Sequence, residues 1–240
     1  MNLEAIQEQL LRRGLDGWLF FDHHQRDPLA YRVLGFSPER HVTRRWYYLV
    51  PAQGEPLKLV HRIESGMLDA LPGERVAYSS WAEQVDGLRR LLMGIGRVAM
   101  QYSPQCAIPY IAMVDAGTVE LVRSLGVQVA SSAELVQYFE ARWTPEALAS
   151  HLEAGRRVDA VRGAAFDLVR ERTRAGASLS EYEVKRFVLD EFARHGLVTD
   201  SGPIVAVNAN ASNPHYEPSA DSTAAIRPGD LLLIDMWAKL

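Results

Sequence analysis

The feature that most constrains the fold of this chain is a change of hydrophobic pattern near Arg142 and Trp143. Before it, short runs rich in β-branched and aromatic residues alternate with segments whose apolar residues recur at helical spacing. Such alternation is typical of an α/β layer architecture. After it, apolar residues recur at helical spacing from Leu148 to Val169. We therefore predict two domains in these 240 residues, 1–142 and 143–240.

Strands and helices are predicted to alternate through the first domain. A helix from about Leu3 ends at Gly14, and Asp27 caps a short helix that ends at Gly35. The predicted strands are 17–22, 46–50, 57–61, 75–79, 98–101 and 127–130. The other predicted helices are 82–93, 115–125 and 132–139. His23 and His24 are adjacent, which makes a poor chelating pair, and we interpret both as loop histidines. No catalytic motif is found in this domain.

The second domain is predicted to contain two helices followed by two strands. Thr144-Pro145-Glu146 starts a long helix, with a capping hydroxyl followed by proline at the first helical position. Ser180 and Glu183 form a capping box that opens a second helix, which ends at Gly196. A strand at 204–207 follows, and Pro228-Gly229 predicts a tight turn before a last strand over 230–235.

Asp235 closes that last strand and is a candidate functional residue. Side chains alternate between the faces of a strand, so Asp235 shares a face with Leu231 and Leu233. Leu232 and Ile234 make the other face apolar too, which predicts a strand covered on both sides. A carboxylate at its end needs a partner, a metal ion or water. The alternative is that Asp235 simply begins the following loop.

Composition excludes several classes of partner. The net charge is −4 and no basic stripe is present, so neither nucleic acid nor a membrane is an expected partner. The arginine pairs Arg12-Arg13, Arg44-Arg45, Arg89-Arg90 and Arg156-Arg157 are interpreted as solvated faces. The single cysteine, Cys106, excludes an internal disulfide and fits a reducing compartment. With no signal peptide and no run long enough to span a bilayer, we expect a cytoplasmic protein.

Four motifs in order give the second domain a resemblance to a known family. They read P-E-A-L…R-R-V-D-A-V, G-A-S-L-S-E-Y-E-V, N-P-H-Y-E-P and R-P-G-D-L-L-L-I-D. This series, over residues 144–235, resembles the pita-bread metallopeptidases, in the branch of Xaa-Pro aminopeptidase, prolidase and creatinase. The resemblance implies a creatinase-like mixed α/β domain in the N-terminal part, followed by the first helix-helix-strand half of the α+β catalytic domain.

The resemblance also implies a reaction. The family binds two divalent metal ions, with Mn²⁺ or Co²⁺ expected and Zn²⁺ as an alternative, through two aspartates, a histidine and two glutamates. Asp235 matches the first of those aspartates. His215 matches a histidine beside the metals that contacts substrate or assists proton transfer, and so is a candidate catalytic and substrate-binding residue. The implied substrates are peptides with proline in second position, and the implied full-length assembly is a homodimer.

The sequence departs from the family at its end. Met236-Trp237 follow Asp235, where the family has a glycine two positions on, and the other metal ligands would lie beyond Leu240. We therefore expect a fragment of a longer enzyme, without peptidase activity alone, whose last strand exposes apolar surface. Two alternatives stay open: a non-catalytic binding module of the same fold, and a creatinase-like hydrolase of a small amidine or amide.

Overall fold

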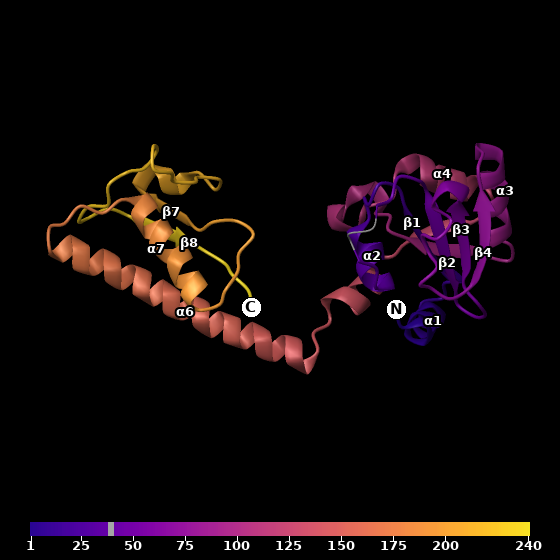
Figure 1. The fold of residues 1–240 in the computed structure, drawn as a ribbon, viewed down its shortest axis with the longest axis horizontal. Coiled ribbons are helices and arrows are strands. Elements are labelled where there is room, and N and C mark those ends of the chain that lie inside the picture. The colour runs from indigo at the N-terminus through magenta and orange to yellow at the C-terminus, as the bar shows by residue number, and fades with distance from the viewer. Residues whose placement is uncertain (38–40) are drawn as a thin grey trace. The chain divides into compact units, whose positions relative to one another are not determined.

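The structure is a computed structural model that describes residues 1–37 and 41–240. The chain forms two compact units, Met1–Arg142 and Trp143–Leu240 (Figure 1). No helix among the described residues has both the length and the apolar character that crossing a membrane requires.

The first unit is built on a six-stranded mixed sheet in the order β4-β3-β2-β1-β5-β6. The strands are β1 (Gly17–Asp22), β2 (Trp46–Pro51), β3 (Leu57–His61), β4 (Glu74–Tyr78), β5 (Arg97–Met100) and β6 (Gln128–Ser131). Only β2 runs opposite to its two neighbours, whereas β1–β5, β3–β4 and β5–β6 are parallel pairs. The strands β1, β3, β4, β5 and β6 therefore all end at the same edge of the sheet.

Helices cover both faces of this sheet, as the figure shows for α2, α3 and α4 around the strands (Figure 1). Trp18 and Phe20 of β1 pack in one core with α1 (Leu3–Arg12), α2 (Pro28–Leu34) and α5 (Ala133–Val136). Leu19 and Phe21 pack in a second core with α3 (Trp81–Leu91) and α4 (Ala116–Ser124). Because successive side chains of β1 are buried on opposite faces, the four residues from Trp18 to Phe21 are all apolar.

The helix ends follow the capping signals of the sequence. The Asp27 side chain accepts a hydrogen bond from the Ala30 amide at 3.0 Å, and Gly35 closes α2 with φ of 75°. The short helical turns η1 (Arg62–Glu64), η2 (Pro104–Cys106), η3 (Pro109–Ile111) and η4 (Gln137–Ala141) complete the unit. The first three carry no hydrophobic period and were not predicted, whereas η4 extends α5 over the predicted helix 132–139.

The second unit has the predicted order of two helices and two strands. The elements are α6 (Pro145–Arg174), α7 (Glu181–Arg194), β7 (Ile204–Val207), η5 (Asn208–Ser212) and β8 (Leu232–Asp235). Thr144 caps α6, and both hydrogen bonds of the Ser180–Glu183 capping box are present at α7. The antiparallel pair β7–β8 lies against α7 (Figure 1).

The last strand corrects one prediction. Leu232 and Ile234 pack against the core of the helices, but Leu231 is 67% exposed and Leu233 38% exposed. The prediction of a strand covered on both sides is therefore wrong for this structure, because the described residues place helices on one face of the β7–β8 pair only. The expectation of an exposed apolar face, drawn from the family resemblance, is confirmed. The strand also begins two residues later than predicted.

Candidate functional site

His215 occupies a tight turn that its neighbours specify. The turn runs from Asn213 to Tyr216 and is closed by the Tyr216 amide, which donates to the Asn213 carbonyl at 3.0 Å. Asparagine in the first position and proline in the second are the residues this turn favours. The Asn213 side chain also accepts from the His215 amide at 3.0 Å. The turn presents His215 as an exposed side chain.

Asp235 is brought to the same place by strand pairing. It pairs with Ile204 at the start of β7, on the exposed face of the β7–β8 pair. Asp235 and His215 line one cavity of about 680 Å³, although 19 residues separate them in the sequence. The cavity is completed by Asp200, Ser201, Gly202, Ile204, Pro214, Tyr216, Glu217 and Trp237.

The segment that carries His215 is fixed by a buried carboxylate at the first position of α7. Glu181 is fully buried and accepts four hydrogen bonds. The Tyr216 hydroxyl donates at 2.6 Å, the Asn210 amide group at 3.0 Å, and the backbone amides of Val207 and Ala224 at 2.7 Å each. One side chain thus connects the end of β7, η5 and both flanks of the His215 turn.

A second side chain of α7 holds the other side of this segment. Lys185, one helical turn after Glu181, donates to the Glu217 carboxylate at 2.7 Å and to the Pro218 carbonyl at 3.2 Å. Its side chain is only 10% exposed and passes Gly202, where an added Cβ would lie 3.1 Å from Lys185 Cε. Absence of a side chain at Gly202 therefore leaves room for the lysine.

The hydrogen bonds set the ionisation of this network. Burial alone would raise the pKa of Glu181, but the bonds from Tyr216, Asn210 and the two backbone amides outweigh it and hold the pKa below its ordinary value. Burial and the bond to Glu181 raise the pKa of Tyr216 to about 12. At neutral pH the carboxylate is therefore charged and the phenol is protonated.

The cavity contains donors that suit a divalent metal ion, but too few of them. Among the described residues, no group of three or more His, Cys, Asp and Glu side chains is arranged to hold a metal ion. Glu217 is engaged by Lys185, and the other carboxylates that line the cavity are Asp235, at the end of β8, and Asp200. These residues do not by themselves form the two-metal site that the resemblance implies.

Sequence reasoning proposed His215 and Asp235 as candidates but missed the residues that fix the segment carrying His215. Glu181 and Lys185 are charged residues spaced four apart on the inward face of α7, among Val184 and Val188. Charged residues at core positions of an amphipathic helix are the signal that could have revealed them. In the first unit, His23 and His24 lie edge to face with ring centroids 4.4 Å apart and belong to no metal-ligand cluster of the described residues.

Comparison with known proteins agrees with this architecture. Residues 149–240 match the sequence model of metallopeptidase family M24. Prolidase from Thermococcus sibiricus is 18% identical with a TM-score of 0.59, over 99% of this chain and 60% of that one. For a dipeptidase from Pyrococcus horikoshii the identity is 20%, the TM-score 0.58 and the coverages 98% and 60%. The Xaa-Pro dipeptidase from Bacillus anthracis is 16% identical with a TM-score of 0.58, over 99% of this chain and 60% of that one.

The chain thus spans about 60% of the length of the solved structures that it resembles. No curated protein sequence matches it significantly. The structural likeness covers both units in one alignment, and the family match falls on the unit that holds the cavity. Residues 149–240 are therefore similar in sequence to metallopeptidase family M24, and the fold of the chain resembles that of the solved prolidase and dipeptidase structures.

Proposed function

We propose that this chain is the N-terminal portion of a metal-dependent exopeptidase that removes the residue preceding proline from X-Pro peptides or dipeptides. The observation that carries the proposal is the convergence of His215 and Asp235 on one cavity. Two solved relatives are described as prolidases or Xaa-Pro dipeptidases, which supports this substrate class. We expect the enzyme to act as a cytoplasmic homodimer.

Asp235 is proposed as one carboxylate ligand of a divalent metal site, with Mn²⁺ or Co²⁺ as the expected ion. The remaining ligands are proposed to come from outside residues 1–240, because the described residues provide no cluster of three. We accordingly expect no peptidase activity from the 240-residue chain alone.

His215 is proposed to contact the substrate and assist proton transfer. Its exposed imidazole faces the cavity from a turn whose backbone is fixed on both sides. A neutral imidazole can donate one hydrogen bond to a developing oxyanion and accept a proton near neutral pH. The Glu181 and Lys185 contacts fix the residues that follow His215, so that the backbone of the turn needs little ordering when a peptide binds.

The proposal is tested on the gene product that contains these residues together with those that follow. Hydrolysis of Ala-Pro and of an X-Pro tripeptide is measured with Mn²⁺, Co²⁺ and Zn²⁺, against Ala-Ala and creatine. Asp235→Asn is expected to lower metal stoichiometry, and His215→Ala to lower kcat about 100-fold or more with metal content unchanged. Asp200→Asn is the matched control, since it removes another cavity carboxylate.

Three outcomes would contradict the proposal. Binding of peptides without cleavage or metal uptake would favour a non-catalytic binding module. Turnover of creatine in place of X-Pro substrates would favour a creatinase-like hydrolase. Unchanged metal stoichiometry in Asp235→Asn would remove that residue from the metal site.

A further inference from the structure

A second cavity opens in the first unit, where neither the proposed reaction nor the family match places a function. It has a volume of about 280 Å³ and lies at the edge of the sheet where β1, β3 and β4 end. Arg44 and Arg45, which immediately precede β2, line it together with His23, Trp81 and Gln84. Ligands of open α/β sheets bind in crevices outside the carboxyl ends of the strands.

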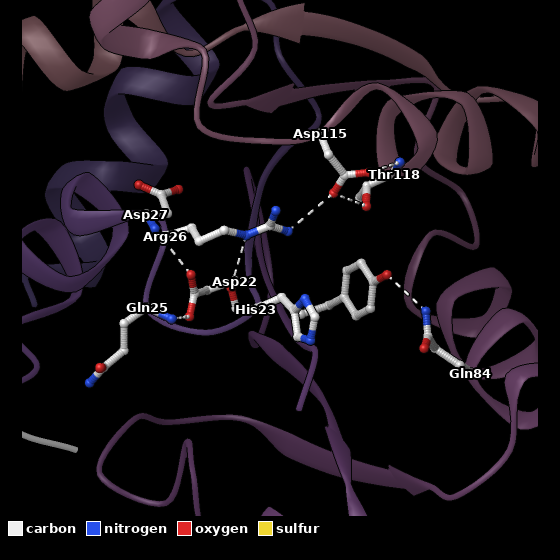
Figure 2. Close-up of polar contacts among 9 residues, drawn as sticks. Asp22, His23, Gln25, Arg26, Asp27, Gln84, Asp115 and Thr118 are labelled. Atoms are coloured by element: carbon white, nitrogen blue, oxygen red, sulfur yellow. Dashed lines mark hydrogen bonds and ion pairs between the residues drawn. The ribbon is translucent and has the colours of Figure 1, made fainter. Parts of the chain in front are cut away.

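The two arginines are available for a ligand. Among the described residues, neither guanidinium forms an ion pair with a carboxylate, and Arg45 lies over the Trp81 ring at 6.0 Å from its centroid. Arg26 nearby is different, because its side chain reaches from the His23 carbonyl to Asp115 (Figure 2). Glu64 interacts electrostatically with Arg44, but no ion pair within 4.0 Å joins a described carboxylate to either guanidinium.

The backbone that carries these arginines is anchored at three points. The Glu64 carboxylate accepts from the Thr43 amide at 2.9 Å and from the Arg44 amide at 3.1 Å. The Tyr78 hydroxyl donates to the Arg45 carbonyl at 2.8 Å. A segment fixed in this way needs little further ordering of its backbone when a ligand binds.

Most of the other described residues that line the cavity are polar. Buried Gln84 donates to the Tyr47 hydroxyl at 2.9 Å, and His23 lies in the same region (Figure 2). No aspartate or glutamate is among the described residues that line the cavity. Glu83, close by, is occupied as an acceptor from the Ser79 amide at 2.7 Å, and Ser80 caps α3.

We propose that this cavity binds a small oxyanion, the phosphate or carboxylate group of a small molecule, between the guanidiniums of Arg44 and Arg45. Planar guanidinium groups match the oxygens of such anions in bidentate hydrogen bonds. The Trp81 ring offers an apolar wall for the rest of the molecule. This site is independent of the hydrolytic reaction proposed for the second unit.

The test measures anion binding to the full 240-residue chain by calorimetry at constant ionic strength. Inorganic phosphate and succinate are the two probes, which distinguish a phosphate from a carboxylate ligand, and chloride supplies the ionic background. Saturable binding of at least one probe is expected, with a Kd below about 1 mM. The double variant Arg44→Gln/Arg45→Gln should weaken it about tenfold or more.

Arg89→Gln/Arg90→Gln is the matched control. It removes two arginines that are also consecutive in the sequence and lie in the same unit, but do not line the cavity. It should leave the Kd within about twofold. If the circular dichroism spectrum shows that the double variant is unfolded, Arg45→Lys is used in its place. Lysine keeps the positive charge but lacks the planar guanidinium that binds two anion oxygens at once. Absence of saturable binding, or an equal loss in the control, would overturn the proposal.

The imidazole of His23 provides a site-specific readout. Burial and the neighbouring His24, Arg45 and Arg26 lower the pKa of His23. An anion seated beside Arg45 should raise that pKa, as followed by NMR with and without saturating phosphate or succinate. The same rise in Arg44→Gln/Arg45→Gln would mean that the anion binds elsewhere and would overturn the assignment.

Discussion

The Tyr216 hydroxyl donates a 2.6 Å hydrogen bond to the fully buried carboxylate of Glu181, and Tyr216 directly follows the proposed active-site residue His215. The same carboxylate accepts from the amides of Val207 and Ala224, which lie before and after the His215 turn. The first residue of a helix therefore positions a turn that is more than 30 residues away in the sequence.

Replacing Glu181 with glutamine should destabilise the second unit by about 3 kcal/mol. Glutamine keeps one acceptor oxygen, but its amide group then faces two of the four hydrogen-bond donors without an acceptor to offer them. Urea-induced unfolding measures the loss. Hydrogen exchange at the Val207 and Ala224 amides, which donate to this carboxylate, should accelerate together.

Glu183→Gln is the control for that change, because it makes the same chemical substitution two residues away on an exposed side chain. Glu183 completes the capping box by accepting from Ser180, and its loss should cost about 1 kcal/mol or less. Equal losses in the two variants would show that Glu181 contributes no more than a helix cap.

The pH dependence of the second unit should carry the signature of Glu181. Its pKa is lower in the folded state than the ordinary value of 4.5, so its contribution to stability is present above pH 4.5 and is lost as pH falls through the folded-state pKa. Exchange at the Val207 amide, measured between pH 6 and pH 3 and corrected for intrinsic rates, should show this loss. The Glu181→Gln variant should show a flatter profile, and parallel profiles would contradict the assignment.

Asp27 should give the first unit a pH dependence of opposite sign. Burial raises its pKa from 3.8 to about 7, Asp22 adds to the rise, and its second carboxylate oxygen has no hydrogen-bond partner. Between those pH values the folded state retains a proton that the unfolded state releases, so stability falls as pH rises from about 4 to 7. Figure 2 shows Asp27 beside Asp22.

Asp27→Asn should remove this slope while keeping the cap that accepts from Ala30. The stability difference between variant and parent should therefore shift in favour of the variant by up to about 4 kcal/mol between pH 4 and pH 8. Urea unfolding at several pH values measures it. Asp115→Asn is the control: bonds from Thr118 outweigh burial and lower the pKa of Asp115, so that variant should show no such gain.

The local signals in the sequence were sufficient for most helices and strands. Strand β1 was predicted to its ends, and the caps at Asp27, Thr144 and Ser180 were confirmed, because each depends on neighbours in the chain. The shared cavity of His215 and Asp235 was expected only through the family resemblance. Their assignment to catalysis and metal binding stays a prediction.

Features that depend on distant segments were not predictable in this way. The four hydrogen bonds to Glu181 come from residues that lie between 26 and 43 positions after it in the sequence. No local sequence pattern predicts these contacts. The alternation from Leu231 to Ile234 predicted which side chains share a face of the strand. It did not predict which face is covered, because that depends on where the helices pack. The cavity at Arg44 and Arg45 likewise arises from strand ends that meet only in the folded sheet.

Gly73 should be essential for the pairing of β3 with β4. Its φ is 107°, and an added Cβ would lie 2.1 Å from the Pro56 carbonyl oxygen, which is backbone and cannot move alone. Gly73→Ala must therefore separate the starts of the two strands, at a cost of about 3 kcal/mol or more. Fluorescence of the buried Trp18 and Trp46 during urea unfolding reports on this unit.

Gly54→Ala isolates the steric part of that cost. Gly54 also has a positive φ, of 93°, but an added Cβ would meet nothing within 4 Å. Its replacement should cost only the conformational penalty of about 1 kcal/mol. The difference between the two variants is then the energy of the contact with Pro56. If both lose equal stability, close approach of the two strands does not require glycine at position 73.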